Sequence, residues 1–199
     1  MNLAAVALAA VVGYLVGTIS PATLIAHARG IDIAHSGSGN PGAANVGRVL
    51  GRRTGIIVGL LDLLKGLVPT LAFLPFGEVP PLVAGVAAVL GHCTSPWLRG
   101  HGGKGVATSL GAILGVHPLA GVACVAVFLI VFLITRWVAL ASIAAAAALL
   151  VGSVLFGIAE PDDQLATVLW ATALALIVLW RHKNNLVDRW RNGPRTTTA

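Results

Sequence analysis

Charged side chains are scarce in this chain. Of its 199 residues, 10% are charged and 57% are hydrophobic, and the mean hydropathy is +0.90. A soluble globular domain carries about 25% charged residues, so the composition excludes that class. It is typical of a protein whose helices cross a membrane several times.

Cysteine is almost absent, and no pattern that would bind a metal ion is present. The two cysteines are Cys93 and Cys124, and Cys124 lies within an apolar run. Neither has a partner at a ligand spacing, so we expect no disulfide framework, no metal and no cofactor. A basic leader is also missing at the N-terminus, and we expect the first apolar segment to be retained.

Seven apolar segments divide the chain. They lie near residues 3–26, 55–76, 80–92, 105–116, 118–135, 137–158 and 164–181. Crossing the hydrocarbon takes about 20 helical residues, so the third and fourth segments are short and draw the loop between them into the interface. We therefore predict one all-α, polytopic membrane domain over residues 1–199, with about seven transmembrane helices.

Acidic residues are few, and basic residues gather on one side. If the seven segments alternate in direction, all 13 lysines and arginines fall on the same side. The opposite side carries Glu78, Glu160, Asp162 and Asp163. By the positive-inside rule, the N-terminus is outside and the C-terminus is cytoplasmic.

The basic side also predicts the chemistry of the partners. A net charge of +6 favours anionic lipid headgroups and anionic small-molecule substrates, and no motif indicates a nucleic acid. The amphipathic residues 181–191 begin a tail, residues 181–199, which we expect to lie along the cytoplasmic interface.

Three polar clusters lie on the basic side, at residues 37–51, 91–108 and 180–190. A single glycine or asparagine in such a cluster is usually a turn residue. Three clusters that converge from distant parts of the chain instead indicate a binding site. The donors that they offer to a dianionic, phosphorylated ligand are Ser38, Arg48, Lys104, His182 and Asn185.

The second cluster has the composition of a phosphate-binding turn. Gly102, Gly103 and Gly105 flank Lys104, just before an apolar segment. Backbone N–H groups of such turns bind phosphate beside a helix N-terminus, here at a membrane surface. The further residues that we predict to contact substrate are Gly37, Gly39, Asn40, Asn45 and His92. A helix-end role without a ligand is the alternative for the histidine.

Together the clusters resemble the three motifs of the bacterial acyl-phosphate:glycerol-3-phosphate acyltransferases, membrane enzymes of seven transmembrane helices. The first motif, Gly-Ser-Gly-Asn-x-Gly-Ala-Thr-Asn-Val-x-Arg-x-Leu-Gly, is similar to residues 37–51, with Ala44 in place of the threonine. The second matches at Gly91-His92 and residues 102–108, with His101 in place of a lysine. The third, Arg-His-x-x-Asn and a following base, matches from Arg181.

The resemblance implies transfer of a fatty acyl group from acyl phosphate to the 1-hydroxyl of glycerol 3-phosphate. The products are lysophosphatidic acid and phosphate, and the reaction is a step of phospholipid biosynthesis. The resemblance also implies that it takes place at the cytoplasmic face of the bacterial inner membrane. It also implies that Ser38, Arg48, Lys104, His182 and Asn185 form the catalytic site. Because acyl phosphate is already activated, the enzyme needs to position a hydroxyl and stabilise charge. No residue is an obvious general base, and an enzyme that produces acyl phosphate is a candidate partner.

Other interpretations remain open. An organophosphate transporter would also gather bases, although near the membrane midplane and with repeated halves, and an inactive lipid-binding scaffold would need only the basic surface. His27 and Asp32 match the His-x4-Asp pattern of other glycerolipid acyltransferases, in which the aspartate orients a histidine base. Asp62 and Lys65, three residues apart, predict an ion pair at the cytoplasmic rim.

Overall fold

The computed structural model describes residues 2–159, 165–185 and 187, and within these ranges every regular element is helical. The elements are α1 (Leu3–Thr18), α2 (Pro21–His27), η1 (Ile33–His35), α3 (Ala43–Leu50), α4 (Arg52–Phe73), η2 (Leu74–Phe76), α5 (Val79–Thr94), η3 (Pro96–Leu98), α6 (Val106–Val116), α7 (Pro118–Thr135), α8 (Val138–Ala159) and α9 (Leu165–Arg181). The predicted all-α class is confirmed. Most of the tail predicted to follow the interface lies outside the described residues.

Each predicted apolar segment is helical, but the segments differ in length. Five stretches of the described chain are long and apolar enough to cross a membrane, at residues 3–27, 52–76, 79–98, 118–135 and 138–158. The third is longer than predicted, because η3 extends α5. Helix α6 has 11 residues, or about 16 Å at 1.5 Å per residue, so it spans roughly half of the hydrocarbon.

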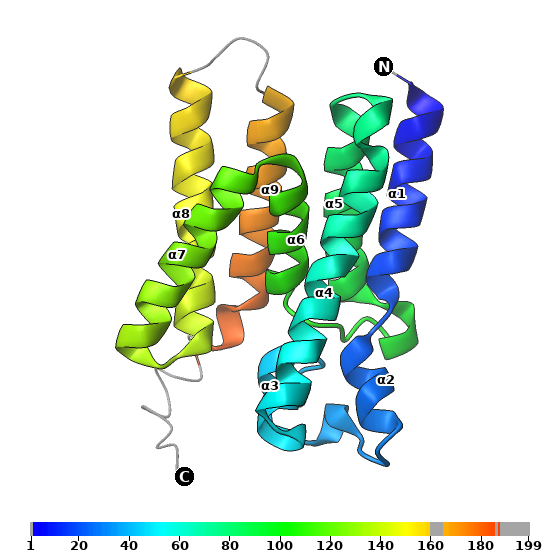
Figure 1. Ribbon diagram of the computed structural model, residues 1–199, viewed down its shortest axis with the longest axis vertical. Helices are drawn as coiled ribbons and strands as arrows, with labels where there is room; N and C mark the ends of the chain where they lie inside the picture. Colours follow the sequence, from blue (N-terminus) through cyan, green and yellow to red (C-terminus); the bar gives the residue numbers. More distant parts are fainter. Residues whose placement is uncertain (1, 160–164, 186, 188–199) are drawn as a thin grey trace.

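The helices run alternately up and down through one bundle (Figure 1). Helix α1 begins at the upper end of the view, and α9 ends at the lower end. The lower end also carries α2, α3 and the loop between α5 and α6 (Figure 1). The three polar clusters of the sequence therefore lie at the same end of the bundle.

The first apolar segment is interrupted, which the sequence analysis did not predict. Helix α1 ends at Thr18, and α2 starts again at Pro21 after two extended residues. Because proline has no N–H group, it cannot donate to the carbonyl of Gly17 and continue the first helix. Ser20 instead caps α2, its hydroxyl accepting a hydrogen bond from the Thr23 N–H group at 3.3 Å.

Small residues set the closest helix contacts. Helices α1 and α5 touch backbone to backbone, and a Cβ at Gly13 or Gly17 would overlap a carbonyl oxygen of α5. A Cβ at Gly66 or Gly111 would likewise overlap a carbonyl oxygen across the α4–α6 contact. In a bilayer such contacts replace the hydrophobic effect as the force that holds helices together.

The outward face of the bundle is apolar. Leu15 on α1, Leu60 on α4, Leu133 on α7 and Leu155 on α8 are each exposed by 57–60%. Patches of this kind are costly in water but match lipid tails. The structure is thus that of a multi-pass membrane protein.

Candidate active site

The loop of the first cluster is shaped by Asn45, a buried residue of α3 that is 1% exposed. Its side-chain oxygen accepts a hydrogen bond from the Ser38 N–H group at 2.7 Å, and its nitrogen donates to the Ser36 carbonyl at 2.9 Å. The sequence analysis assigned Asn45 to substrate binding. These bonds engage the amide with the backbone of its own loop, and its substrate contact stays a prediction.

The same loop presents Ser38 to Arg48. Gly37 and Gly39 have φ angles of +61° and +71°, a left-handed backbone that favours glycine and turns the chain around the serine. The guanidinium of Arg48, one helix later, donates to the Ser38 hydroxyl at 3.2 Å. Both side chains are exposed, so a ligand can reach them. Asn40 is half-buried beside this loop, and its substrate contact stays a prediction.

The glycine turn of the second cluster differs from the prediction in its hydrogen bonds. The N–H groups of Gly102 and Gly103 donate to the carbonyls of Cys93 and His92, each at 3.1 Å. These two amides are therefore engaged with α5, and the phosphate contact of the two glycines stays a prediction. Gly105 caps α6 with a φ of +78°, so the N–H groups of the first turn of α6 remain the amide donors of this turn.

The third cluster closes over this turn. Arg181, the last residue of α9, donates to the carbonyl of Gly102 at 2.7 Å and to that of Gly103 at 3.1 Å. The Lys104 ammonium donates to the side-chain oxygen of Asn185. Two predicted site residues, 81 positions apart, are thus in direct contact. The sequence analysis did not assign Arg181 a role, although it opens the third motif.

His182 follows Arg181 in the chain, and its side chain is 2% exposed. Its Nδ1 atom is 2.8 Å from the carbonyl of Val178, an acceptor, so Nδ1 carries a proton and Nε2 is the nitrogen left for a ligand. Burial lowers the pKa of His182, and the charges of Lys104 and Arg181 lower it further. The ring is therefore neutral at physiological pH.

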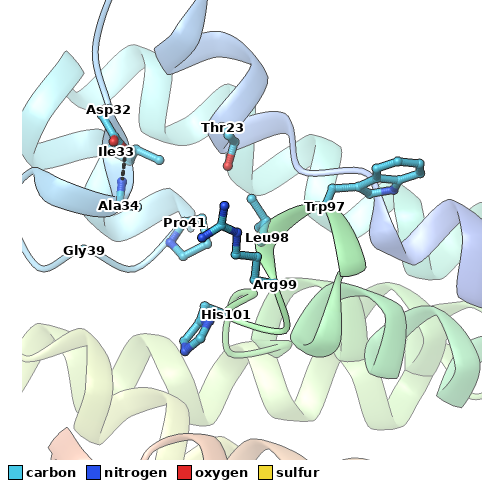
Figure 2. Close-up of a pocket in the computed structure, with 10 residues that line it drawn as sticks. All are labelled: Thr23, Asp32, Ile33, Ala34, Gly39, Pro41, Trp97, Leu98, Arg99 and His101. Atoms are coloured by element: carbon cyan, nitrogen blue, oxygen red, sulfur yellow. Dashed lines mark hydrogen bonds between the residues drawn. The ribbon is translucent and has the colours of Figure 1, made fainter.

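A pocket of about 400 Å³ joins the first and second clusters (Figure 2). Gly39 and Pro41 line it from the first cluster, and Arg99 and His101 line it from the second. The guanidinium of Arg99 extends toward Pro41, while His101 lies on the other side of Arg99 (Figure 2). The exposed cation of Arg99 makes this pocket suitable for an anionic group.

His92, predicted to contact substrate, is buried against the glycine turn. Its side chain is 8% exposed, and a Cβ at Gly103 would overlap its ring. The predicted ion pair is confirmed: Lys65 Nζ lies 3.2 Å from Asp62 Oδ1. The sequence analysis missed that His92 joins this pair, with its Nδ1 2.9 Å from the ammonium. The substrate contact of His92 stays a prediction.

The alternative arrangement, in which Asp32 would orient His27 as a general base, is not formed. The Asp32 carboxylate lies 2.7 Å from Nδ1 of His35 and accepts a hydrogen bond from the Ala34 N–H group at 3.0 Å. The hydrogen bond with His35 holds the pKa of Asp32 below its ordinary value. His27 is exposed at the end of α2.

Comparisons with known proteins show the family to which the chain belongs. The family described as glycerol-3-phosphate acyltransferase matches residues 7–192. The glycerol-3-phosphate acyltransferase of Geobacter sulfurreducens is 45% identical, with 92% of each chain covered. That of Bacillus subtilis is 39% identical, with 91% of this chain and 92% of the relative covered.

Two crystal structures of PlsY, an integral membrane glycerol 3-phosphate acyltransferase, have the same fold. The glycerol 3-phosphate form superposes with a TM-score of 0.85 at 34% identity, and the lysophosphatidic acid form with 0.82 at 35%. Each match covers 94% of this chain and 92% of the other. With this fold, these three motifs and relatives that match along nearly their whole length, the chain belongs to the glycerol-3-phosphate acyltransferase family of integral membrane proteins.

Proposed function

We propose that this protein transfers a fatty acyl group from acyl phosphate to the 1-hydroxyl of glycerol 3-phosphate, releasing lysophosphatidic acid and phosphate. The observation that carries the proposal is the contact of Lys104 with Asn185 at the N-terminus of α6. It sets a cation beside the amide donors of a helix, at the end of the bundle that also carries α3 (Figure 1). Arg48 lies on α3 and is hydrogen-bonded to Ser38. The structural neighbour PlsY has a glycerol 3-phosphate form and a lysophosphatidic acid form, and these two molecules are the acceptor and the product of the proposed reaction.

Arg48 and Lys104 each bind the phosphate of one of the two substrates. The exposed guanidinium of Arg48 binds one phosphate through two hydrogen bonds. Its hydrogen bond to the Ser38 hydroxyl holds the guanidinium in the orientation that this needs. Lys104 and the first turn of α6 bind the other phosphate. Ser38 and Asn185 orient the oxygens between them, since each already contacts one of the two cations.

The reaction is a direct displacement at the acyl carbonyl. The glycerol hydroxyl oxygen attacks the carbonyl carbon, an ester C–O bond forms, and the bond from that carbon to the phosphate oxygen breaks. Lys104 stabilises the charge that develops on the departing phosphate. Neutral His182 offers Nε2 as an acceptor to the attacking hydroxyl, and the proton leaves on the phosphate, so no covalent enzyme intermediate is needed.

The donor is tested with purified protein in lipid. Palmitoyl phosphate with glycerol 3-phosphate should release phosphate and form lysophosphatidic acid in equal amounts, whereas palmitoyl coenzyme A should give no product. Transfer from the thioester and none from acyl phosphate would contradict the proposed donor while leaving an acyltransferase.

We also place this site at the cytoplasmic face of the bacterial inner membrane. The lower end of the bundle carries α2, α3 and the loop between α5 and α6 (Figure 1). Arg29 follows α2, Arg48 lies on α3, and Arg99 and Lys104 lie between α5 and α6; such an excess of bases marks the cytoplasmic side. In a variant without the native cysteines, Ser36→Cys should react with an impermeant maleimide only after the cells are opened. Glu78→Cys, between α4 and α5, should react in intact cells, and the reverse pattern would overturn the orientation.

A further inference from the structure

Three ionisable side chains form a buried cluster that the displacement chemistry does not use. Asp62 and Lys65 lie one turn apart on α4, and His92 comes from α5. Their side chains are 5%, 7% and 8% exposed. Burying charges is costly unless they are paired and fully hydrogen-bonded, so a cluster of this kind needs a reason to be there.

The ammonium of Lys65 completes the interrupted first helix. Gly17 has lost its usual helical donor, because the residue four positions later is Pro21. Lys65 Nζ donates to the carbonyl of Gly17 at 3.0 Å and to that of Ile19 at 2.6 Å. Two of its three N–H bonds are thus directed at the break between α1 and α2.

The third N–H bond of Lys65 determines the state of the histidine. Lys65 Nζ lies 2.9 Å from His92 Nδ1, whereas Asp62 Oδ1 lies 3.5 Å from the same nitrogen, beyond the usual length of an N–H···O hydrogen bond. The ammonium is thus the partner of Nδ1, and an ammonium can only donate. Nδ1 of His92 must therefore accept, and in the neutral ring the proton resides on Nε2. Asp62 Oδ1, 3.2 Å from the ammonium, balances the charge that imposes this arrangement.

The ring that is held in this way lies against the glycine turn of the second cluster. A Cβ at Gly103 would overlap Nε2 of His92, so this nitrogen lies directly over the glycine. The backbone of the same histidine accepts the Gly103 N–H group at 3.1 Å. The next residue along the turn is Lys104, which we placed at the departing phosphate.

We propose that Lys65 is a positioning residue that fixes His92 as the tautomer protonated on Nε2, and that this N–H group donates to a phosphoryl oxygen bound at the Gly103-Lys104 turn. The inference rests on the proposed function for the identity of the ligand. The tautomer itself does not depend on it, so the two can fail separately. Asp62 has the supporting role of keeping the ammonium charged in its buried position.

The tautomer is measured by nitrogen NMR on protein labelled with ¹⁵N-histidine in lipid. The His92 ring, assigned by its disappearance in His92→Gln, should show a protonated Nε2 and an unprotonated Nδ1. If that variant does not fold, single replacements of the other histidines assign the signal by elimination. A protonated Nδ1 in the wild-type protein would overturn the proposal, whatever the activity is.

A double-mutant cycle tests whether Lys65 acts through the histidine. Lys65→Met keeps the length of the side chain and removes the charge, and it should lower kcat on the order of 100-fold, because misplaced groups cost about that much. His92→Gln retains an amide N–H donor that has no tautomers. In that background Lys65→Met should cause little further loss, whereas two losses that multiply would show that Lys65 supports only the helix break and would refute the proposal.

Discussion

Replacing Lys104 by alanine is the sharpest test of the proposed site. Its ammonium contacts Asn185, the side chain is half-buried at the start of α6, and no covalent step can compensate for its loss. A hydrogen bond to a charged group contributes about 1.5–3 kcal/mol. At 1.36 kcal/mol per factor of ten, kcat/KM should fall at least about 10- to 160-fold. The loss grows further if the ammonium binds the transition state more tightly than the ground state.

The assay is phosphate release from palmitoyl phosphate at low glycerol 3-phosphate concentration, so that the rate reports kcat/KM. Lys183→Ala is the matched control, because it removes the same charge from the same end of the bundle. Lys183 is exposed, and its ammonium lies 5.0 Å from the centroid of the Trp180 ring. Its loss should leave the rate near that of wild type. Equal rates for the two variants, with both proteins folded, would refute the assignment of Lys104.

Four further substitutions separate chemical from structural roles. Arg48→Lys should raise KM for glycerol 3-phosphate about tenfold or more, since an ammonium cannot form the bidentate fork, and Arg53→Lys, at the exposed start of α4, should not. Asn45→Ala should lower the free energy of unfolding by about 1–3 kcal/mol, measured by thermal denaturation, whereas Ser38→Ala should lose activity and keep its Tm. Burial lowers the pKa of His182, so as the pH falls this histidine is protonated in the unfolded state before it is protonated in the folded state. Tm should therefore fall as pH drops below about 6.5, and His182→Asn should weaken that dependence.

The sequence predicted the parts of this protein that depend on local composition. Long apolar segments predicted the helices. The lysines and arginines were predicted to gather on one side, and the polar clusters meet at one end of the bundle, as that prediction requires. The contact of Lys104 with Asn185 followed from the convergence of motifs. Each of these inferences uses residue type and spacing, which a single chain displays directly.

The sequence did not predict features that depend on which backbone groups meet. The amides of Gly102 and Gly103 are engaged because the turn folds back onto Cys93 and His92, and no local pattern specifies that contact. The hydrogen bonds of Asn45 to its own loop were not predicted for the same reason, since a polar residue in a glycine-rich motif looks the same in sequence whether it faces a substrate or its own loop.

The short length of α6 has a consequence for how the protein is made. A helix of about 16 Å cannot partition into the bilayer as an independent span, so it must enter in the company of a neighbour. The backbone contact at Gly66 and Gly111 makes α4 that neighbour, and α4 is synthesised earlier. Membrane insertion of the turn at residues 102–105 therefore follows the arrival of α4, against which α6 docks. The place of Lys104 in the membrane is decided by assembly of the bundle, and the hydropathy of its own segment does not suffice.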